Sequence, residues 1–218
     1  MKQIYLDNAA TSFPKAPGVA EAMFNYITKV GTNIHRSSGS AEAAEMVVYN
    51  TRELICELFH FSQPENVIFT KNVTESLNLI IKGLLQPGDH VLVSSMEHNA
   101  VMRPLVSLSA KGVEFSRVPG NDKGELDLQS LEQLIQPHTK AVIMTHASNV
   151  SGVILPLKEI SEICQKHQLC FIVDAAQTAG ILELNLEETQ LDALAFTGHK
   201  SLLGPQGMGG FILSDRLA

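Results

Sequence analysis

The residues best suited to chemistry lie between positions 194 and 210, in the stretch LAFTGHKSLLGPQGMGG. Its start predicts an apolar strand that breaks at Thr197-Gly198, and His199 and Lys200 follow at once. A lysine placed directly after a buried strand can be partly desolvated, which lowers the pKa of its amine and makes the amine a nucleophile. Taken alone, the stretch is more typical of a lysine that ends a strand and reaches water.

Polar side chains also follow two earlier apolar runs. Thr74 comes after a predicted strand at 66–70 and opens a helix, where a hydroxyl, backbone N–H groups and the helix dipole suit a phosphate. His98 comes after a predicted strand at 90–94, and an imidazole there can stack on a planar ring or move a proton. The alternatives are a helix N-cap for Thr74 and a polar loop residue for His98.

Three more polar residues follow the next apolar runs. Asn149 comes shortly after a predicted strand at 141–145 and offers an amide. Asp174 directly follows the apolar run 170–173, so its carboxylate must be partly buried and needs a cation or a hydrogen-bond donor. Gln177 stands three residues further on. Structural pairing of Asp174 with an arginine or a helix N-terminus is the alternative.

The elements that would position these residues alternate along the chain. Helical spacing predicts helices over residues 19–30, 41–59, 75–85, 99–111, 127–135 and 157–168. Short apolar runs predict strands over residues 66–70, 90–94, 113–118, 141–145, 170–173, 192–196 and 210–213. This alternation indicates an α/β fold of three layers, α/β/α, with a mostly parallel sheet and helices on both faces. Such sheets bind ligands beyond the carboxyl ends of their strands.

One cofactor uses all of these strand-end groups. Pyridoxal 5′-phosphate needs a lysine for a Schiff base and a carboxylate that keeps its pyridine nitrogen protonated. It also needs donors for its phosphate and a flat group against its ring. Lys200, Asp174, Thr74 and His98 offer these groups, so the strand ends together predict a pyridoxal phosphate site.

The composition is that of an ordinary soluble globular protein. A chain of 218 residues with 44% hydrophobic residues predicts one large domain with a sizeable core. The net charge of −7 gives no sign of binding to nucleic acid or to an anionic membrane. The start of the chain has no signal-peptide character, and no apolar run is long enough to span a bilayer. Three cysteines without metal-ligand spacing predict buried thiols in a reducing cytoplasm: Cys56, Cys164 and Cys170.

Six motifs carry a resemblance to a known family. They are IYLDNAATSFPK, FTKNVTESLNL, SMEHNAV, SNVSG, IVDAAQTAG and FTGHKSLLGPQGMGG. With them the whole chain resembles the class V aminotransferases, which are pyridoxal phosphate enzymes of fold type I. VDAAQ and GHK at this separation are highly specific, and the amino-terminal DNAAT is characteristic. Within the family, the chain is most similar to cysteine desulfurases and selenocysteine lyases.

The resemblance implies a role for each strand-end residue. Lys200 forms the Schiff base and later moves protons at the substrate α-carbon, so Lys200 and His98 are the expected catalytic residues. Asp174 pairs with the pyridine nitrogen, and His98 stacks on the ring. The other expected cofactor contacts are Asn149 and Gln177 near the phenolic oxygen, and Thr74, Thr197 and His199 at the phosphate.

The resemblance also implies an activity and partners. A cysteine desulfurase converts L-cysteine to L-alanine and passes the sulfur to an enzyme cysteine, works as a homodimer and can use a sulfur-acceptor protein. Transamination, or selenocysteine lyase action on another small amino acid, stays open, as does a catalytically incomplete fragment that serves as a binding or dimerisation module. Ser37 follows His35-Arg36 where some desulfurases have a glycine, which leaves the subgroup open. A nucleotide-binding protein is disfavoured, because neither GxGxxG nor GxxxxGK[ST] follows a predicted strand.

The carboxyl-terminal part of the family pattern is missing from this sequence. Family members carry the sulfur-accepting cysteine and an arginine for the substrate carboxylate in a smaller second domain, and this sequence stops at Ala218. Residues 1–218 are therefore expected to form the cofactor-binding large domain alone. Cys56 and Cys164 fall on predicted helices and Cys170 begins a predicted strand, so none of them is expected to accept sulfur.

Overall fold

A seven-stranded sheet forms the centre of the molecule, whose computed structural model describes residues 4–34 and 39–218. The strand order is β1-β7-β6-β5-β4-β2-β3. The strands are β1 (Val67–Thr70), β2 (His90–Ser94), β3 (Glu114–Val118), β4 (Thr139–Thr145), β5 (Cys170–Asp174), β6 (Ala193–Thr197) and β7 (Gly209–Leu213). Strand β7 is antiparallel to its neighbours β1 and β6, and the other neighbouring strands are parallel. The predicted α/β fold with a mostly parallel sheet is confirmed.

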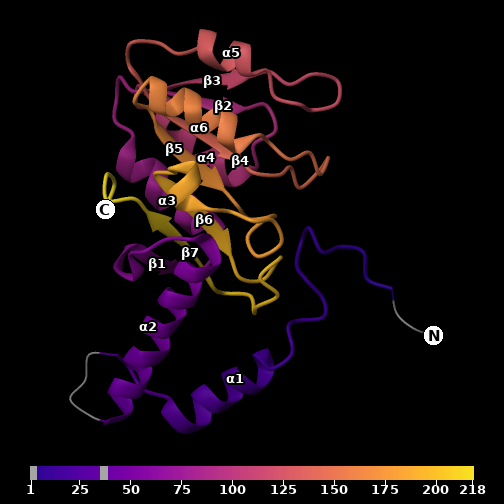
Figure 1. Cartoon of the computed structure of the whole chain (residues 1–218), viewed down its shortest axis with the longest axis vertical. Helices are drawn as coiled ribbons and strands as arrows, with labels where there is room; N and C mark the ends of the chain where they lie inside the picture. The colour runs from indigo at the N-terminus through magenta and orange to yellow at the C-terminus, as the bar shows by residue number, and fades with distance from the viewer. Residues whose placement is uncertain (1–3, 35–38) are drawn as a thin grey trace.

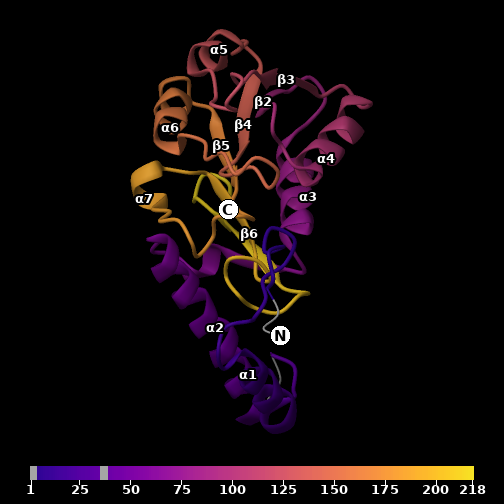
Figure 2. The same ribbon diagram turned by 90° about the vertical axis from the view of Figure 1, so that its right-hand side faces the viewer.

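Helices lie on both sides of this sheet (Figure 2). Alternate residues of the central strand β4 serve the two sides, because successive side chains of a strand point to opposite faces. Val142 and Met144 pack in one core with α2, α5, α6 and α7, whereas Ala141 and Ile143 pack in the other with α3 and α4. The helices are α2 (Gly39–Phe59), α3 (Val73–Leu84), α4 (Asn99–Ser109), α5 (Leu128–Gln133), α6 (Leu157–Lys166) and α7 (Leu186–Thr189). Only α7 was not predicted, because four residues are too few to show a helical period.

The amino-terminal helices project away from the sheet (Figure 1). Helix α1 (Val19–Asn25) continues into the π-helical turn η1 (Tyr26–Val30), which confirms the helix predicted over 19–30. Neither segment buries a residue, and the side chains of Phe24 and Ile27 are 64% and 70% exposed. The apolar side chains whose spacing predicted this helix therefore pack into no core within the described chain. Over the same described ranges, no helix combines the length and apolar character needed to cross a membrane.

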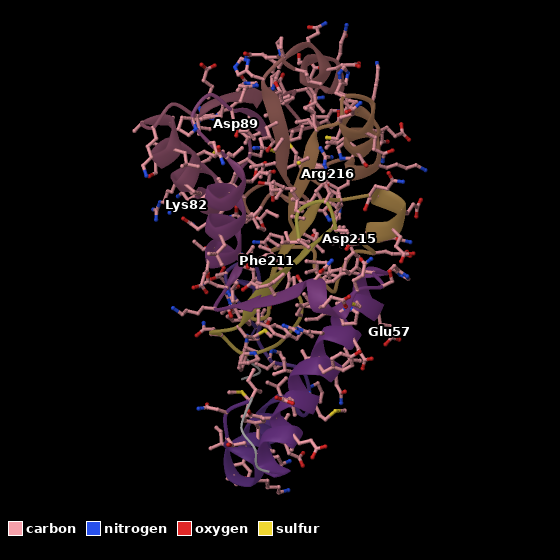
Figure 3. All side chains as sticks on the ribbon, turned by 90° about the vertical axis from the view of Figure 1, so that its left-hand side faces the viewer. Glu57, Lys82, Asp89, Phe211, Asp215 and Arg216 are labelled. Atoms are coloured by element: carbon pink, nitrogen blue, oxygen red, sulfur yellow. The ribbon has the colours of Figure 1, made fainter. Side chains whose placement is uncertain are left out.

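The end of the chain lies at the edge of the sheet where the parallel strands begin. Arg216 Nη1 lies 3.6 Å from Asp192 Oδ2, just before β6, and Figure 3 shows Arg216 and Asp215 beside each other. Asp215 accepts hydrogen bonds from the side-chain amides of Gln63 and Asn66, which precede β1. The antiparallel direction of β7 brings residues 214–218 to this edge, and these contacts hold them there, away from the edge where the parallel strands end.

Candidate active site

A cavity of about 240 Å³ opens at the carboxyl ends of the parallel strands. Seven of the eight predicted site residues line it: Thr74, His98, Asn149, Asp174, Gln177, His199 and Lys200. A larger hollow of about 780 Å³ lies at the opposite edge, beside Asp192 and Arg216, but no predicted site residue lines that hollow. The smaller cavity is therefore where residues scattered over more than 120 positions of the chain come together.

Lys200 lies half-buried in the turn after β6, as its position behind an apolar strand predicted. Burial lowers the pKa of its amine, and the nearby carboxylate of Asp174 opposes that shift. The pKa of His199 is also lowered, first by burial and then by the positive charges of Lys200 and Lys15. The cavity thus favours a neutral imidazole beside an amine that loses its proton more readily than an ordinary lysine.

Asp174 is the last residue of β5 and is only 2% exposed. Its Oδ1 accepts a hydrogen bond from the backbone N–H of Ala176 at 2.9 Å. Burial raises the pKa of this carboxyl, while Ala176, Lys200 and His98 lower it. A buried carboxylate at a cavity wall is costly unless a cation or a donor faces it, so Asp174 suits a ligand that brings a positive group.

Thr74 lies in the first turn of α3, which begins two residues earlier than predicted. The helix N-cap is Asn72, whose Oδ1 accepts the Glu75 N–H at 2.9 Å, so the alternative that Thr74 forms the cap is wrong. Glu75 turns back, and its Oε2 accepts the Lys71 N–H at 2.7 Å. The carboxylate that could oppose an anion is thereby engaged outside the cavity, while Thr74 lines it.

His98 has a structural task that the sequence did not predict. It is the N-cap of α4, and its Nδ1 accepts the Ala100 N–H at 3.1 Å. A ring whose Nδ1 accepts a hydrogen bond carries its single proton on Nε2 when neutral, and the cap fixes its orientation. Gln177 is also engaged, because its Nε2 donates to the carbonyl oxygen of Ala9 at 3.1 Å, whereas Asn149 is exposed at the cavity mouth.

Thr197 is the one predicted site residue that does not line the cavity. It ends β6 and is 1% exposed, and its Oγ1 is a buried atom without a hydrogen-bond partner among the described residues. A buried hydroxyl normally finds a partner, so this atom fits a site completed by a bound group. The loop residues His35, Arg36 and Ser37 lie outside the described residues.

Residues 7–16, here called the amino-terminal strap, hold the turn that contains Lys200. The His199 carbonyl oxygen accepts hydrogen bonds from the Ser12 N–H at 2.8 Å, the Thr11 hydroxyl at 2.9 Å and the Lys15 ammonium at 3.1 Å. Sequence reasoning gave these residues no role of their own, because their partners lie more than 180 positions away. The strap fixes the peptide unit that joins His199 to Lys200.

Replacing Lys15 by methionine is expected to loosen this strap. The ammonium also donates to Thr11 Oγ1 and Ser12 Oγ, so the variant loses three hydrogen bonds at a half-buried position. We expect a loss of about 1–2 kcal/mol in the free energy of unfolding, measured by urea denaturation. Lys29→Met on the exposed face of η1 is the control, and equal midpoints for the two variants would contradict the assignment.

His146 follows β4 but does not line the cavity. The residue is 7% exposed, its Nδ1 lies 2.9 Å from Thr178 Oγ1, and burial lowers its pKa from 6.5 to about 4. In the unfolded chain His146 therefore becomes protonated below pH 6.5, whereas in the folded chain it stays neutral down to about pH 4. The contribution of His146 to the free energy of unfolding is fully present above pH 6.5. It is lost as the pH falls from 6.5 to about 4, by up to about 1.4 kcal/mol per pH unit.

The variant His146→Asn keeps a hydrogen-bonding amide near Thr178 and removes the titration. Urea unfolding between pH 7 and pH 4.5 is expected to show a flatter fall in stability for this variant than for the wild type. If stability falls equally with decreasing pH in the variant and the wild type, folding does not lower the pKa of His146, which would contradict the prediction.

Comparison with known proteins places the chain in a family. The family model described as aminotransferase class V matches residues 4–218, and the chain belongs to this family. The expected resemblance and fold are confirmed. Members of this class use pyridoxal phosphate, a group that the donor set of the cavity fits: an amine, a buried carboxylate, a fixed imidazole and a helix N-terminus with a threonine.

Relatives within the family are cysteine desulfurases. The chain is 36% identical over 217 residues to cysteine desulfurase IscS of Buchnera aphidicola subsp. Baizongia pistaciae, covering 96% of this chain and 53% of the relative. It is similar to the apo structure of a cysteine desulfurase from Thermococcus onnurineus, with 34% identity and a TM-score of 0.92 over 98% of this chain and 54% of that one. It is also similar to the structure of SspA in complex with cysteine, with 28% identity and a TM-score of 0.90 over 98% of this chain and 62% of that one. The chain spans about half the length of the relatives it matches.

Proposed function

We propose that the cavity binds pyridoxal 5′-phosphate and that the chain is the cofactor-binding domain of a cysteine desulfurase-like enzyme. The observation that carries the proposal is that Lys200 and Asp174 line the same cavity, near enough for the charge of each to act on the other. The charge of each residue favours the charged form of the other, whereas burial disfavours the charged form of both. The protonation state of the two side chains is therefore sensitive to a charged group bound in the cavity. A lysine with a lowered pKa beside a buried carboxylate supports a cofactor that needs both groups.

In this proposal the residues of the chain bind and orient the cofactor. Lys200 Nζ would hold the cofactor covalently and would move a proton at the α-carbon of the amino-acid substrate. Asp174 would keep the pyridine nitrogen protonated, and the capped ring of His98 would lie against the pyridine ring. When bound, pyridoxal phosphate withdraws electrons from the substrate α-carbon.

The remaining predicted residues divide between two ends of the cofactor. We assign Asn149 and Gln177 to the phenolic oxygen. Thr74, the first amides of α3, His199 and the unpartnered hydroxyl of Thr197 are assigned to the phosphate. The neutral state favoured for His199 lets one ring nitrogen donate toward the phosphate while Nδ1 faces Thr11 Oγ1 at 3.1 Å.

Cysteine is the proposed substrate, because the named relatives are cysteine desulfurases and SspA has a structure with cysteine. The sulfur is passed to a cysteine other than Cys56, Cys164 and Cys170, since all three are buried and burial raises the pKa of each thiol. We further propose that the protein works as a homodimer with a separate sulfur-acceptor protein, in a reducing cytoplasm. The exposed apolar side chains of α1 and η1 support a partner surface.

The test is to supply the protein with pyridoxal phosphate, cysteine and dithiothreitol as the sulfur acceptor. The expected result is alanine and sulfide in equal amounts, without a requirement for a keto acid. Transfer of the amino group to an added keto acid, with no release of sulfide, would instead assign the site to a transaminase. An external thiol is used so that the outcome does not depend on an enzyme cysteine.

A further inference from the structure

A carboxyl group without an assigned role lies in the loop between β2 and α4. Glu97 directly precedes His98, and its Oε1 accepts hydrogen bonds from the Ser94 hydroxyl and from the Thr145 N–H, the latter at 2.9 Å. Ser94 and Thr145 are the last residues of β2 and β4, which are neighbours in the sheet. Thr145 also lines the cavity. One carboxyl oxygen therefore joins two strand ends at the cavity wall.

This bridge also fixes the loop that carries His98. On the amino-terminal side, the Met96 N–H donates to Ser94 Oγ at 3.2 Å, so the hydroxyl that donates to Glu97 also holds the loop backbone. On the other side, His98 caps α4 through Ala100. His98 therefore follows the Glu97 bridge directly in the chain and is held on its other side by its own helix cap.

We propose that Glu97 is a positioning residue, whose Oε1 sets the His98 ring and the Thr145 wall of the cavity by accepting two hydrogen bonds. The inference rests on the proposed function, in which His98 lies against the pyridine ring. It assigns Glu97 a geometric task, carried by an acceptor oxygen, and does not require a negative charge on Glu97.

The surroundings of Glu97 agree with a neutral side chain. Its second oxygen, Oε2, is buried without a hydrogen-bond partner in the described part of the chain. Asp174 pairs with Thr145 across β4 and β5, so two carboxyl groups flank the same residue. Burial raises the pKa of Glu97 to about 8, and the charge of Asp174 adds to the rise. A protonated Glu97 leaves the negative charge to Asp174, which faces the cavity.

The first test uses the cofactor-free protein and two variants, Glu97→Gln and Glu97→Ala. Glutamine keeps an acceptor oxygen and carries no charge, whereas alanine leaves the Thr145 N–H without its partner. We expect amide hydrogen exchange at Thr145 to become at least about tenfold faster in Glu97→Ala. Exchange in Glu97→Gln is expected to stay within about threefold of the wild type.

The second test measures pyridoxal phosphate affinity by absorbance titration of the same proteins. Glu97→Ala is expected to bind about tenfold more weakly and to shift the absorbance maximum of the bound cofactor, because the ring against it has moved. Glu97→Gln is expected to restore both values to within about threefold and a few nanometres of the wild type. Glu162→Ala, exposed on α6, is the matched control.

Two outcomes would overturn the inference. Wild-type exchange and affinity in Glu97→Ala would show that the bridge positions nothing, and equal damage in Glu97→Gln would show that charge is required. Ser94→Ala removes the hydroxyl bond to Glu97 and the Met96 N–H bond to that hydroxyl, but it leaves Glu97 to accept the Thr145 N–H. It serves if Glu97→Ala fails to fold: a partial loss is expected, and no change counts against the inference. A wild-type protein that takes up no pyridoxal phosphate would refute the proposed function, while the exchange at Thr145 still tests the bridge.

Discussion

Lys200→Ala is expected to abolish covalent retention of pyridoxal phosphate and to reduce turnover by at least ~10³-fold, the order found when a nucleophile is removed. The amine lies half-buried at the cavity wall, where burial lowers its pKa and makes the neutral form available. The measurement is the visible absorbance that stays with the protein after gel filtration, together with the rate of alanine formation.

Two further variants separate the nucleophile from its charge. Lys200→Arg keeps a cation beside Asp174 but cannot form the covalent bond, so it is expected to lose retention as completely as Lys200→Ala. Lys158→Ala removes an exposed lysine of α6 and is expected to behave like the wild type. Retained cofactor in Lys200→Arg would contradict the role given to Lys200.

Asp174→Asn is expected to have two effects of opposite sign. In the proposed site the variant removes the negative partner of the pyridine nitrogen. Breaking a buried ion pair costs roughly 3–5 kcal/mol, which corresponds to about two to four decades in cofactor affinity. The cofactor-free protein is expected to be as stable as the wild type or more stable. Burial raises the pKa of Asp174, so the empty fold disfavours its charge, and asparagine keeps an oxygen for the Ala176 N–H.

Asp192→Asn is the control for Asp174→Asn. Asp192 is another buried aspartate, 7% exposed, but it lies at the opposite edge and accepts hydrogen bonds from the Phe171 N–H and the Ser214 hydroxyl. This variant is expected to change unfolding in urea and to leave cofactor affinity unchanged. If both variants bind the cofactor equally well, Asp174 does not pair with it.

Most of the fold could be predicted because every strand and every helix except the short α7 carries a local signal in the sequence. The apolar strands of four to seven residues and the helices α2, α3, α4 and α6 follow from their periodicity, and seven of the eight site residues line one cavity as their strand-end positions implied. The antiparallel direction of β7 carries no such signal. It follows from the chain turn at Gly204–Gly207, which returns the strand beside β6.

The features that escaped prediction depend on partners far away in the chain. The His199 carbonyl accepts donors from the amino-terminal strap, more than 180 residues earlier. Glu97 bonds the Thr145 N–H, 48 residues later, and no periodicity marks it. The burial of Thr197 Oγ1 likewise appears only when the strands are assembled. Such contacts decide how the site residues are held, which residue types alone do not show.

The most direct measurement of the central claim is reduction of the protein with borohydride in the presence of pyridoxal phosphate, followed by proteolysis and mass spectrometry. A cofactor held at the cavity predicts that the phosphopyridoxyl group is found on the peptide containing Lys200 and that little label is found on Lys15 or Lys158. A label spread evenly over exposed lysines, or none on Lys200, would contradict the assignment of this cavity.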